Sequence, residues 1–72
     1  MIRVTIIDDE PHARRTLVKL LTKYDKGVKI AGQAGSVAEG IALLQQERPQ
    51  LVFLDIKMQD GSGFDLLDQL PV

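Results

Sequence analysis

Several features are missing from this 72-residue sequence, and each absence excludes a class of function. There is no cysteine, so the chain forms no disulfide and carries out no thiol chemistry, which suits a reducing cytoplasm. The formal net charge is −1, from 9 basic and 10 acidic residues, which gives no strongly basic surface for nucleic acid or an anionic membrane. No apolar run approaches membrane-spanning length, and the first residues lack a signal-peptide pattern. A cytoplasmic location is therefore expected.

What remains is a chain with the composition of one small globular domain. Hydrophobic residues make up 44% of the sequence, as in a folded protein. A domain of this length buries only about 60% of its unfolded surface, so its stability is expected to be marginal.

Three strands are expected, and their patterns differ. Residues 2–7 and residues 51–54 are almost continuously apolar, which is typical of strands covered on both faces. Residues 28–34 instead alternate apolar with polar or small side chains, which indicates a half-exposed strand at a sheet edge.

A helix is expected after each strand, because apolar residues recur there at helical spacing. The three helices are expected to cover residues 11–24, residues 37–47 and residues 64–70. Ser36 and Glu39 predict a capping box for the second helix. Asp25-Lys26-Gly27 is expected to end the first helix, and Gly61-Ser62-Gly63 is expected to be a loop.

The alternation of strands and helices predicts an α/β fold with a parallel sheet and helices on both faces. The half-exposed strand belongs at an edge, beside the first strand. We therefore expect the strand order 2-1-3, with right-handed crossovers. This order places the carboxyl ends of the first and third strands side by side.

Acidic residues follow both of these adjacent strands. Asp8, Asp9 and Glu10 come after the first strand, and Asp55 comes directly after the third. Side chains at the carboxyl ends of neighbouring parallel strands converge on one crevice. Carboxylates that face one another repel unless a cation lies between them, and Mg²⁺ prefers oxygen ligands. The arrangement predicts a domain that handles phosphoryl groups.

Three segments then carry a resemblance to a known family. They are residues 6–11 (Ile-Ile-Asp-Asp-Glu-Pro), residues 51–58 (Leu-Val-Phe-Leu-Asp-Ile-Lys-Met) and residues 60–67 (Asp-Gly-Ser-Gly-Phe-Asp-Leu-Leu). In this order and spacing they resemble the receiver domain of two-component response regulators, most closely the LytTR-type receivers, over the whole chain. The resemblance implies a flavodoxin-like doubly wound parallel sheet, whose strand order in this part is also 2-1-3.

The resemblance also implies roles for individual residues in signalling rather than in enzyme turnover. Asp55 matches the phosphoacceptor, which takes a phosphoryl group from a phosphohistidine of a sensor histidine kinase. Asp9 matches a direct Mg²⁺ ligand, and Asp8 matches the acidic residue that acts on the ion through water. Lys57 matches the position whose backbone carbonyl completes the metal shell. A cation is needed because a carboxylate is a weak nucleophile toward an anionic phosphoryl group.

The chain departs from the family pattern in two respects. Many receivers carry a proline where this chain has Gln59, and we expect the change to loosen the loop after Asp55. The family fold has five strand–helix units, and residues 1–72 correspond to the first three, without the hydroxyl residue and the lysine that contact the phosphoryl group in the family. Residues 51–54 would then form an open, apolar sheet edge, which favours self-association. LytTR-type receivers usually precede a DNA-binding domain, which would lie outside these residues.

Other interpretations stay open from the sequence. The chain could be a non-signalling fragment that keeps a metal-binding rim and self-associates, and Asp8 or Asp9 alone would be interpreted as a helix N-cap. A phosphatase of the haloacid-dehalogenase type also uses an aspartate nucleophile and Mg²⁺. That class requires Asp-x-Asp after its first strand, and Asp8-Asp9-Glu10 does not fit.

The remaining polar residues are interpreted as structural or solvated. Glu10 is expected to be a charge at a helix start, and His12 a solvated surface residue. Residues 32–36 are expected to be a strand-to-helix turn, because they lack the lysine and spacing of a phosphate loop. Solvated helix charges are expected at Arg14, Arg15 and Lys19. An exposed polar face with charges at helix starts is expected from Asp60, Asp65 and Asp68.

Overall fold

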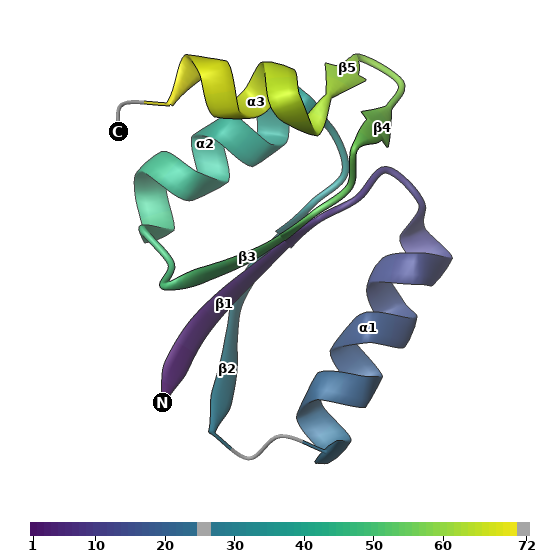
Figure 1. Ribbon diagram of the computed structural model, residues 1–72. Helices are drawn as coiled ribbons and strands as arrows, with labels where there is room; N and C mark the ends of the chain where they lie inside the picture. Colours follow the sequence, from purple (N-terminus) through teal and green to yellow (C-terminus); the bar gives the residue numbers. More distant parts are fainter. Residues whose placement is uncertain (25–26, 71–72) are drawn as a thin grey trace.

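A computed structural model describes residues 1–24 and 27–70, and it contains the expected alternation of strands and helices (Figure 1). In chain order the elements are β1 (Ile2–Ile7), α1 (Pro11–Tyr24), β2 (Val28–Ala34), α2 (Val37–Glu47), β3 (Leu51–Leu54), β4 (Lys57–Met58), β5 (Gly61–Ser62) and α3 (Gly63–Gln69). The expected end of the first helix at residues 25–27 falls largely outside the described residues. Among the described helices, none has the length and hydropathy needed to cross a membrane.

The main sheet has the order β2-β1-β3, and both pairings are parallel, so the predicted topology is confirmed. Ile7 at the end of β1 pairs with Ala34 of β2 and with Leu54 of β3. The three strands therefore end at the same level. Figure 1 shows α1 on one face of the sheet, with α2 and α3 on the other.

The core is built around β1, because this strand has neighbours on both edges and helices on both faces. Val4, Thr5, Ile6 and Ile7 are all buried. Helices α2 and α3 pack against Ile7. Gly40 of α2 allows α3 to approach closely, because a β-carbon on residue 40 would lie 2.8 Å from Cδ1 of Leu66. This packing fixes the β1 end of the sheet, where Asp8 follows.

The segment after β3 differs from the prediction. Residues 61–63 were expected to be a loop, but Gly61 and Ser62 form β5, which pairs antiparallel with β4. Helix α3 begins at Gly63, one residue earlier than the first apolar residue, Phe64. The reason is a capping box, in which Ser62 Oγ accepts from the Asp65 N–H and the Asp65 carboxylate accepts from the Ser62 N–H.

The capping box predicted for α2 forms only in part. Ser36 Oγ accepts from the Glu39 N–H at 3.1 Å, as expected for an N-cap. The Glu39 carboxylate, however, accepts from the Gly35 N–H at 3.2 Å, one residue before the cap. Residues 35–36 connect β2 to α2, so the predicted strand-to-helix turn is confirmed there, whereas residues 32–34 of the predicted turn still belong to β2.

Candidate metal and phosphoacceptor site

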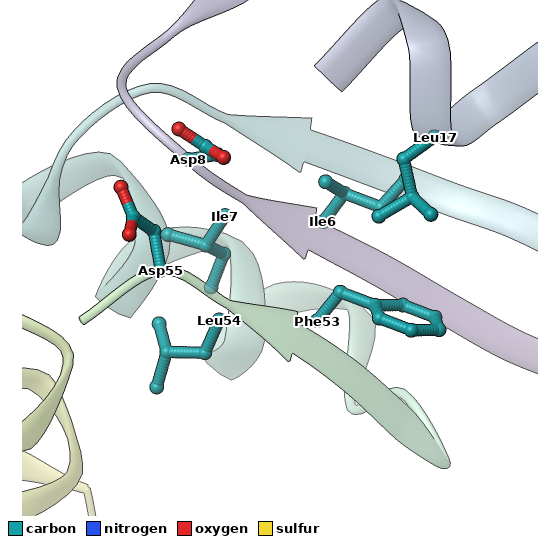
Figure 2. A pocket seen from close by; sticks show the side chains of 7 residues that line it. All are labelled: Ile6, Ile7, Asp8, Leu17, Phe53, Leu54 and Asp55. Atoms are coloured by element: carbon teal, nitrogen blue, oxygen red, sulfur yellow. The ribbon is translucent and has the colours of Figure 1, made fainter. Parts of the chain in front are cut away.

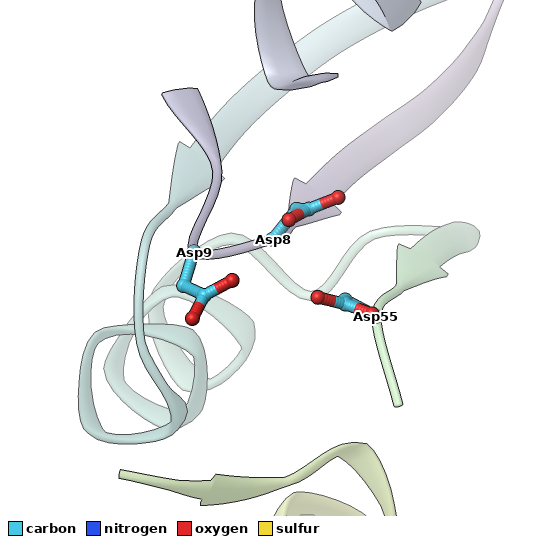
Figure 3. Close-up of side chains that lie close together, drawn as sticks. All are labelled: Asp8, Asp9 and Asp55. Carbon is cyan, nitrogen blue, oxygen red and sulfur yellow. The ribbon is translucent and has the colours of Figure 1, made fainter. Parts of the chain in front are cut away.

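Two aspartates are fixed at the same rim by backbone hydrogen bonds that continue the sheet beyond the strand ends. The Asp8 N–H donates to the Ala34 carbonyl at 3.0 Å, and the Asp55 N–H donates to the Ile7 carbonyl at 2.9 Å. Asp9 is the next residue along the chain from Asp8. Figure 3 shows the three side chains gathered where β1 and β3 end.

The carboxylates of Asp8, Asp9 and Asp55 each offer one oxygen, and these atoms all lie within 4.8 Å of one another. All three residues are half-buried. Two unit charges 4 Å apart repel by about 1 kcal/mol in bulk water and about 4 kcal/mol at the effective dielectric constant near a protein surface. The sequence therefore folds into an arrangement that a cation would stabilise.

A backbone N–H also binds one oxygen of each carboxylate. Asp8 Oδ1 accepts from Glu10 at 2.9 Å, and Asp9 Oδ2 accepts from Gln59 at 3.0 Å. Asp55 Oδ1 accepts from Lys57 at 3.3 Å. These bonds restrict the rotation of each carboxylate, and the second oxygen of each can serve a shared ion.

The donor set fits Mg²⁺. Its ligands are hard oxygens at about 2.0–2.1 Å, so two oxygens on opposite sides of the ion are about 4.1 Å apart. The separations at this rim, up to 4.8 Å, suit one or two direct carboxylates with a third reached through water. Lys57 lies next to the cluster, in β4. Its ammonium group has no acceptor atom for a cation, so its backbone carbonyl is the part that can contribute.

Two of the three aspartates, Asp8 and Asp55, also line a pocket of about 200 Å³ (Figure 2). Asp8 and Asp55 lie at its rim, and side chains from α1, β1 and β3 form its apolar walls. The lining residues are Ile6, Ile7, Asp8, Leu17, Phe53, Leu54 and Asp55. The site therefore combines a charged rim with an apolar floor.

The geometry can be compared with known proteins. The family model of the response regulator receiver domain matches residues 4–72. The chain belongs to the response regulator receiver family. Receiver domains are signalling modules, so the family also argues against the haloacid-dehalogenase alternative.

Curated relatives of this receiver include proteins whose names describe signalling functions. It is 43% identical over 67 residues to the sensory transduction protein LytT of Enterococcus faecalis, with 93% of this chain and 27% of that protein covered. It is 40% identical over 75 residues to the DNA-binding transcriptional activator DevR/DosR of Mycobacterium tuberculosis, with 99% and 34% covered. The receiver sequence thus spans about a third or less of the length of these relatives.

Solved structures agree on the fold. The response regulator PhyR from Brucella abortus is 32% identical and superposes with a TM-score of 0.82, over 94% of this chain and 28% of that one. A LuxR-family response regulator from Aurantimonas sp. SI85-9A1 gives a TM-score of 0.84 at 21% identity, over 92% and 46%. The flavodoxin-like receiver fold predicted from the sequence is confirmed.

The start of α1 also bears on the N-cap interpretation of the acidic residues in this receiver. Glu10 Oε1 accepts from the His12 N–H at 2.7 Å, so Glu10, rather than Asp8 or Asp9, caps α1. Asp8 instead closes a turn onto the Glu10 N–H. The side chain of His12 is exposed, as predicted.

Arg14 was interpreted as a solvated charge, and this was wrong. Its side chain is half-buried, and Nη1 donates to the backbone carbonyl of Asp8. Helical side chains tilt toward the N-terminus of their helix, so an arginine in the first turn of α1 can reach back to the loop after β1. Arg14 therefore brings a positive charge to the loop after β1 and holds the backbone of Asp8 in place.

Asp60 was expected to belong to an exposed polar face with charges at helix starts, and it is indeed exposed, but the helix start that it contacts is that of α2. Its Oδ1 accepts from the Val37 N–H at 2.8 Å and its Oδ2 from the Ala38 N–H at 3.2 Å, so it caps α2 from a distant part of the sequence. The bond from Val37, followed by that from Ala38, holds the pKa of the Asp60 carboxyl below its ordinary value. No local sequence signal identifies a cap that lies more than twenty residues from its helix.

Proposed function

We propose that residues 1–72 are the first three strand–helix units of a receiver domain, and that Asp55 accepts a phosphoryl group from a phosphohistidine of a sensor histidine kinase. The observation that carries this proposal is the gathering of Asp8, Asp9 and Asp55 within 4.8 Å at one rim of the sheet. Asp9 and Asp55 would hold Mg²⁺ directly, Asp8 would act through water, and the Lys57 carbonyl would complete the protein ligands.

The residues of this chain supply the positioning that the transfer needs. The Lys57 N–H donates to Oδ1 of Asp55 and so restricts rotation of the carboxylate, of which one oxygen would hold the ion and the other would attack phosphorus. A bond forms between that oxygen and phosphorus while the bond from phosphorus to the histidine nitrogen breaks, and the imidazole keeps the electron pair. When bound, Mg²⁺ supplies charge screening between the carboxylate and the phosphoryl oxygens.

The relatives support a wider role in signalling. The names of the two curated relatives describe sensory transduction and transcriptional activation. We therefore infer a two-component pathway that regulates transcription, with DNA bound by a segment outside residues 1–72 and not by these residues. A cytoplasmic location stays a prediction from the absence of cysteine.

The test is intact-mass measurement after incubation with acetyl phosphate and Mg²⁺. We expect the mass of one phosphoryl group to be added to the wild-type chain and not to Asp55→Asn. Asp68→Asn is the matched control, because it makes the same change at an exposed aspartate of α3 and should leave the modification intact. Failure of the wild type to gain mass, or modification that survives Asp55→Asn, would count against Asp55 as the phosphoacceptor.

A second candidate is a metal-binding module that self-associates without accepting a phosphoryl group. The position of β3 favours it, because this apolar strand lies at an edge of the three-stranded sheet and Leu51 is 44% exposed. For this candidate, Mg²⁺ should shift amide signals without any mass gain in acetyl phosphate, and sedimentation should show dimers or larger species. A monomer at high concentration would contradict it.

A further inference from the structure

Asp8, Asp9 and Asp55 form what we call the acidic rim of the sheet. Two consecutive residues in the turn between β4 and β5, Gln59 and Asp60, connect this acidic rim to helix α2. The Gln59 N–H donates to Asp9 Oδ2 at 3.0 Å. The Asp60 carboxylate accepts from the N–H groups of Val37 and Ala38 at 2.8 and 3.2 Å. The turn is thus held at one end by a candidate metal ligand and at the other by the first turn of α2.

The contact between Asp60 and α2 has the features of a strong clamp. The first N–H groups of a helix have no partner within the helix, and a negative charge is favoured beside them. Ser36 satisfies the Glu39 N–H, and Asp60 satisfies the N–H groups of Val37 and Ala38. Hydrogen bonds to an ionised carboxylate are stronger than neutral ones, so this clamp holds the position of the turn.

The other end of the turn determines how Asp9 presents its oxygens. With Oδ2 bound to the Gln59 N–H, rotation of the Asp9 carboxylate is restricted and Oδ1 is available to an ion. Hydrogen bonds that orient a ligating carboxylate commonly change metal affinity by about 10- to 100-fold when they are lost. Because Gln59 and Asp60 are adjacent, the contact between Asp60 and α2 also restrains the backbone that presents the Gln59 N–H to Asp9.

We propose that Asp60 is a positioning residue for the metal site, which it influences through Gln59 without touching the ion. The clamp on α2 keeps the Gln59 N–H against Asp9 and keeps β4, which contains Lys57, beside Asp55. This inference rests on the proposed function, since it requires Mg²⁺ to bind at the acidic rim.

The experiment compares Mg²⁺ dissociation constants, measured by calorimetry, for the wild type and three variants. Asp60→Ala should weaken binding by about tenfold, while Ser36→Ala and Asp68→Ala should stay within about twofold of the wild type. Ser36→Ala removes a cap from the same helix without touching the turn, and Asp68→Ala removes an equal charge from α3. An unchanged affinity in Asp60→Ala, or an equal loss in Ser36→Ala, would overturn the inference.

Two further measurements separate positioning from simple loss of structure or charge. Asp60→Asn keeps a carbonyl acceptor for one N–H, so it should retain more Mg²⁺ affinity than Asp60→Ala; equal losses would assign the effect to charge and overturn positioning. In the wild type, Mg²⁺ should shift the amide signals of Val37 and Ala38, and this response should disappear in Asp60→Ala. A wild type that binds no Mg²⁺ refutes the proposed function and this inference together, whereas wild-type affinity in Asp60→Ala refutes only the inference.

Discussion

Replacing the first residue of α3, Gly63, by alanine is a test in which helix propensity predicts a more stable protein and packing predicts a less stable one. Replacing a helical glycine by alanine commonly stabilises a helix by up to about 1 kcal/mol. Gly63, however, is buried, and a β-carbon there would lie 2.6 Å from the Asp55 carbonyl oxygen and 3.0 and 3.2 Å from side-chain carbons of Leu54. Gly63→Ala therefore presses on the backbone of the proposed phosphoacceptor.

The structure allows little relief of this clash. Ordinary contacts begin at 3.4 Å, so the β-carbon and the Asp55 oxygen must separate by 3.4 − 2.6 = 0.8 Å. Both sides are held, because the Gly63 N–H donates to Ile56 and the Asp55 N–H donates to Ile7, each at 2.9 Å. Overpacking of this kind costs about 1–3 kcal/mol. Because both sides are held, we expect a cost near the upper end of this range, about 3 kcal/mol, so the free energy of unfolding should fall by about 2 kcal/mol after the gain in propensity.

Urea denaturation followed by circular dichroism measures this difference. Gly35→Ala is the control: the nearest neighbours of its β-carbon would be side-chain atoms, Arg14 Nη1 at 3.0 Å and Glu39 Oε1 at 3.5 Å, so Arg14 has to move by only 3.4 − 3.0 = 0.4 Å. It should change the unfolding free energy by less than about 0.5 kcal/mol. If Gly63→Ala is as stable as the wild type or more stable, the Asp55 carbonyl does not restrict the size of the side chain at position 63, and the reasoning is wrong. The loss should also be accompanied by slower phosphoryl uptake, because Asp55 is displaced.

Three shorter predictions concern other parts of the chain. Thr5 is buried, and its Oγ1 has no hydrogen-bond partner within the described residues, so Thr5→Val should raise the unfolding free energy by about 1 kcal/mol in urea; a decrease would indicate an unseen partner. The lowered pKa of Asp60 contributes stability that is complete above the ordinary pKa of 3.8 and is lost as the pH falls through the lower pKa of the folded state. The difference in melting temperature between the wild type and Asp60→Asn should therefore be constant above about pH 5 and become smaller below pH 3.8. Leu51→Lys charges the exposed edge of β3 and should reduce self-association in sedimentation, whereas unchanged association would place the contact elsewhere.

The fold was predictable because its strands differ in pattern. Residues 28–34 alternate, and β2 indeed lies at an edge. Residues 2–7 are almost continuously apolar, and β1 is the buried central strand. Once that order is known, Asp8 and Asp55 must lie side by side. Asp8 directly follows β1 and Asp55 directly follows β3, and these two strands end at the same level. The acidic rim was therefore predictable from strand patterns and chain direction alone.

The contacts that support the rim were not predictable in this way. The residues of β4 and β5 are too few to show any periodicity, so the hairpin was expected to be a loop. Asp60 and Arg14 have ordinary surface identities, and their partners are set by where α2 begins and by the direction of a helical side chain. Such contacts depend on tertiary placement, which a local pattern does not encode.

Gln59 illustrates how a departure from a family pattern can be compensated. The sequence led us to expect a looser loop here, because a proline ring would have fixed one backbone angle. The same ring would have removed the N–H, and in this chain the Gln59 N–H donates to Asp9. The turn is thus anchored by hydrogen bonds to Asp9 on one side and from α2 on the other, rather than by a rigid residue within it. Because Asp9 both accepts this hydrogen bond and is a candidate metal ligand, a cation bound at the acidic rim should also affect the position of the turn.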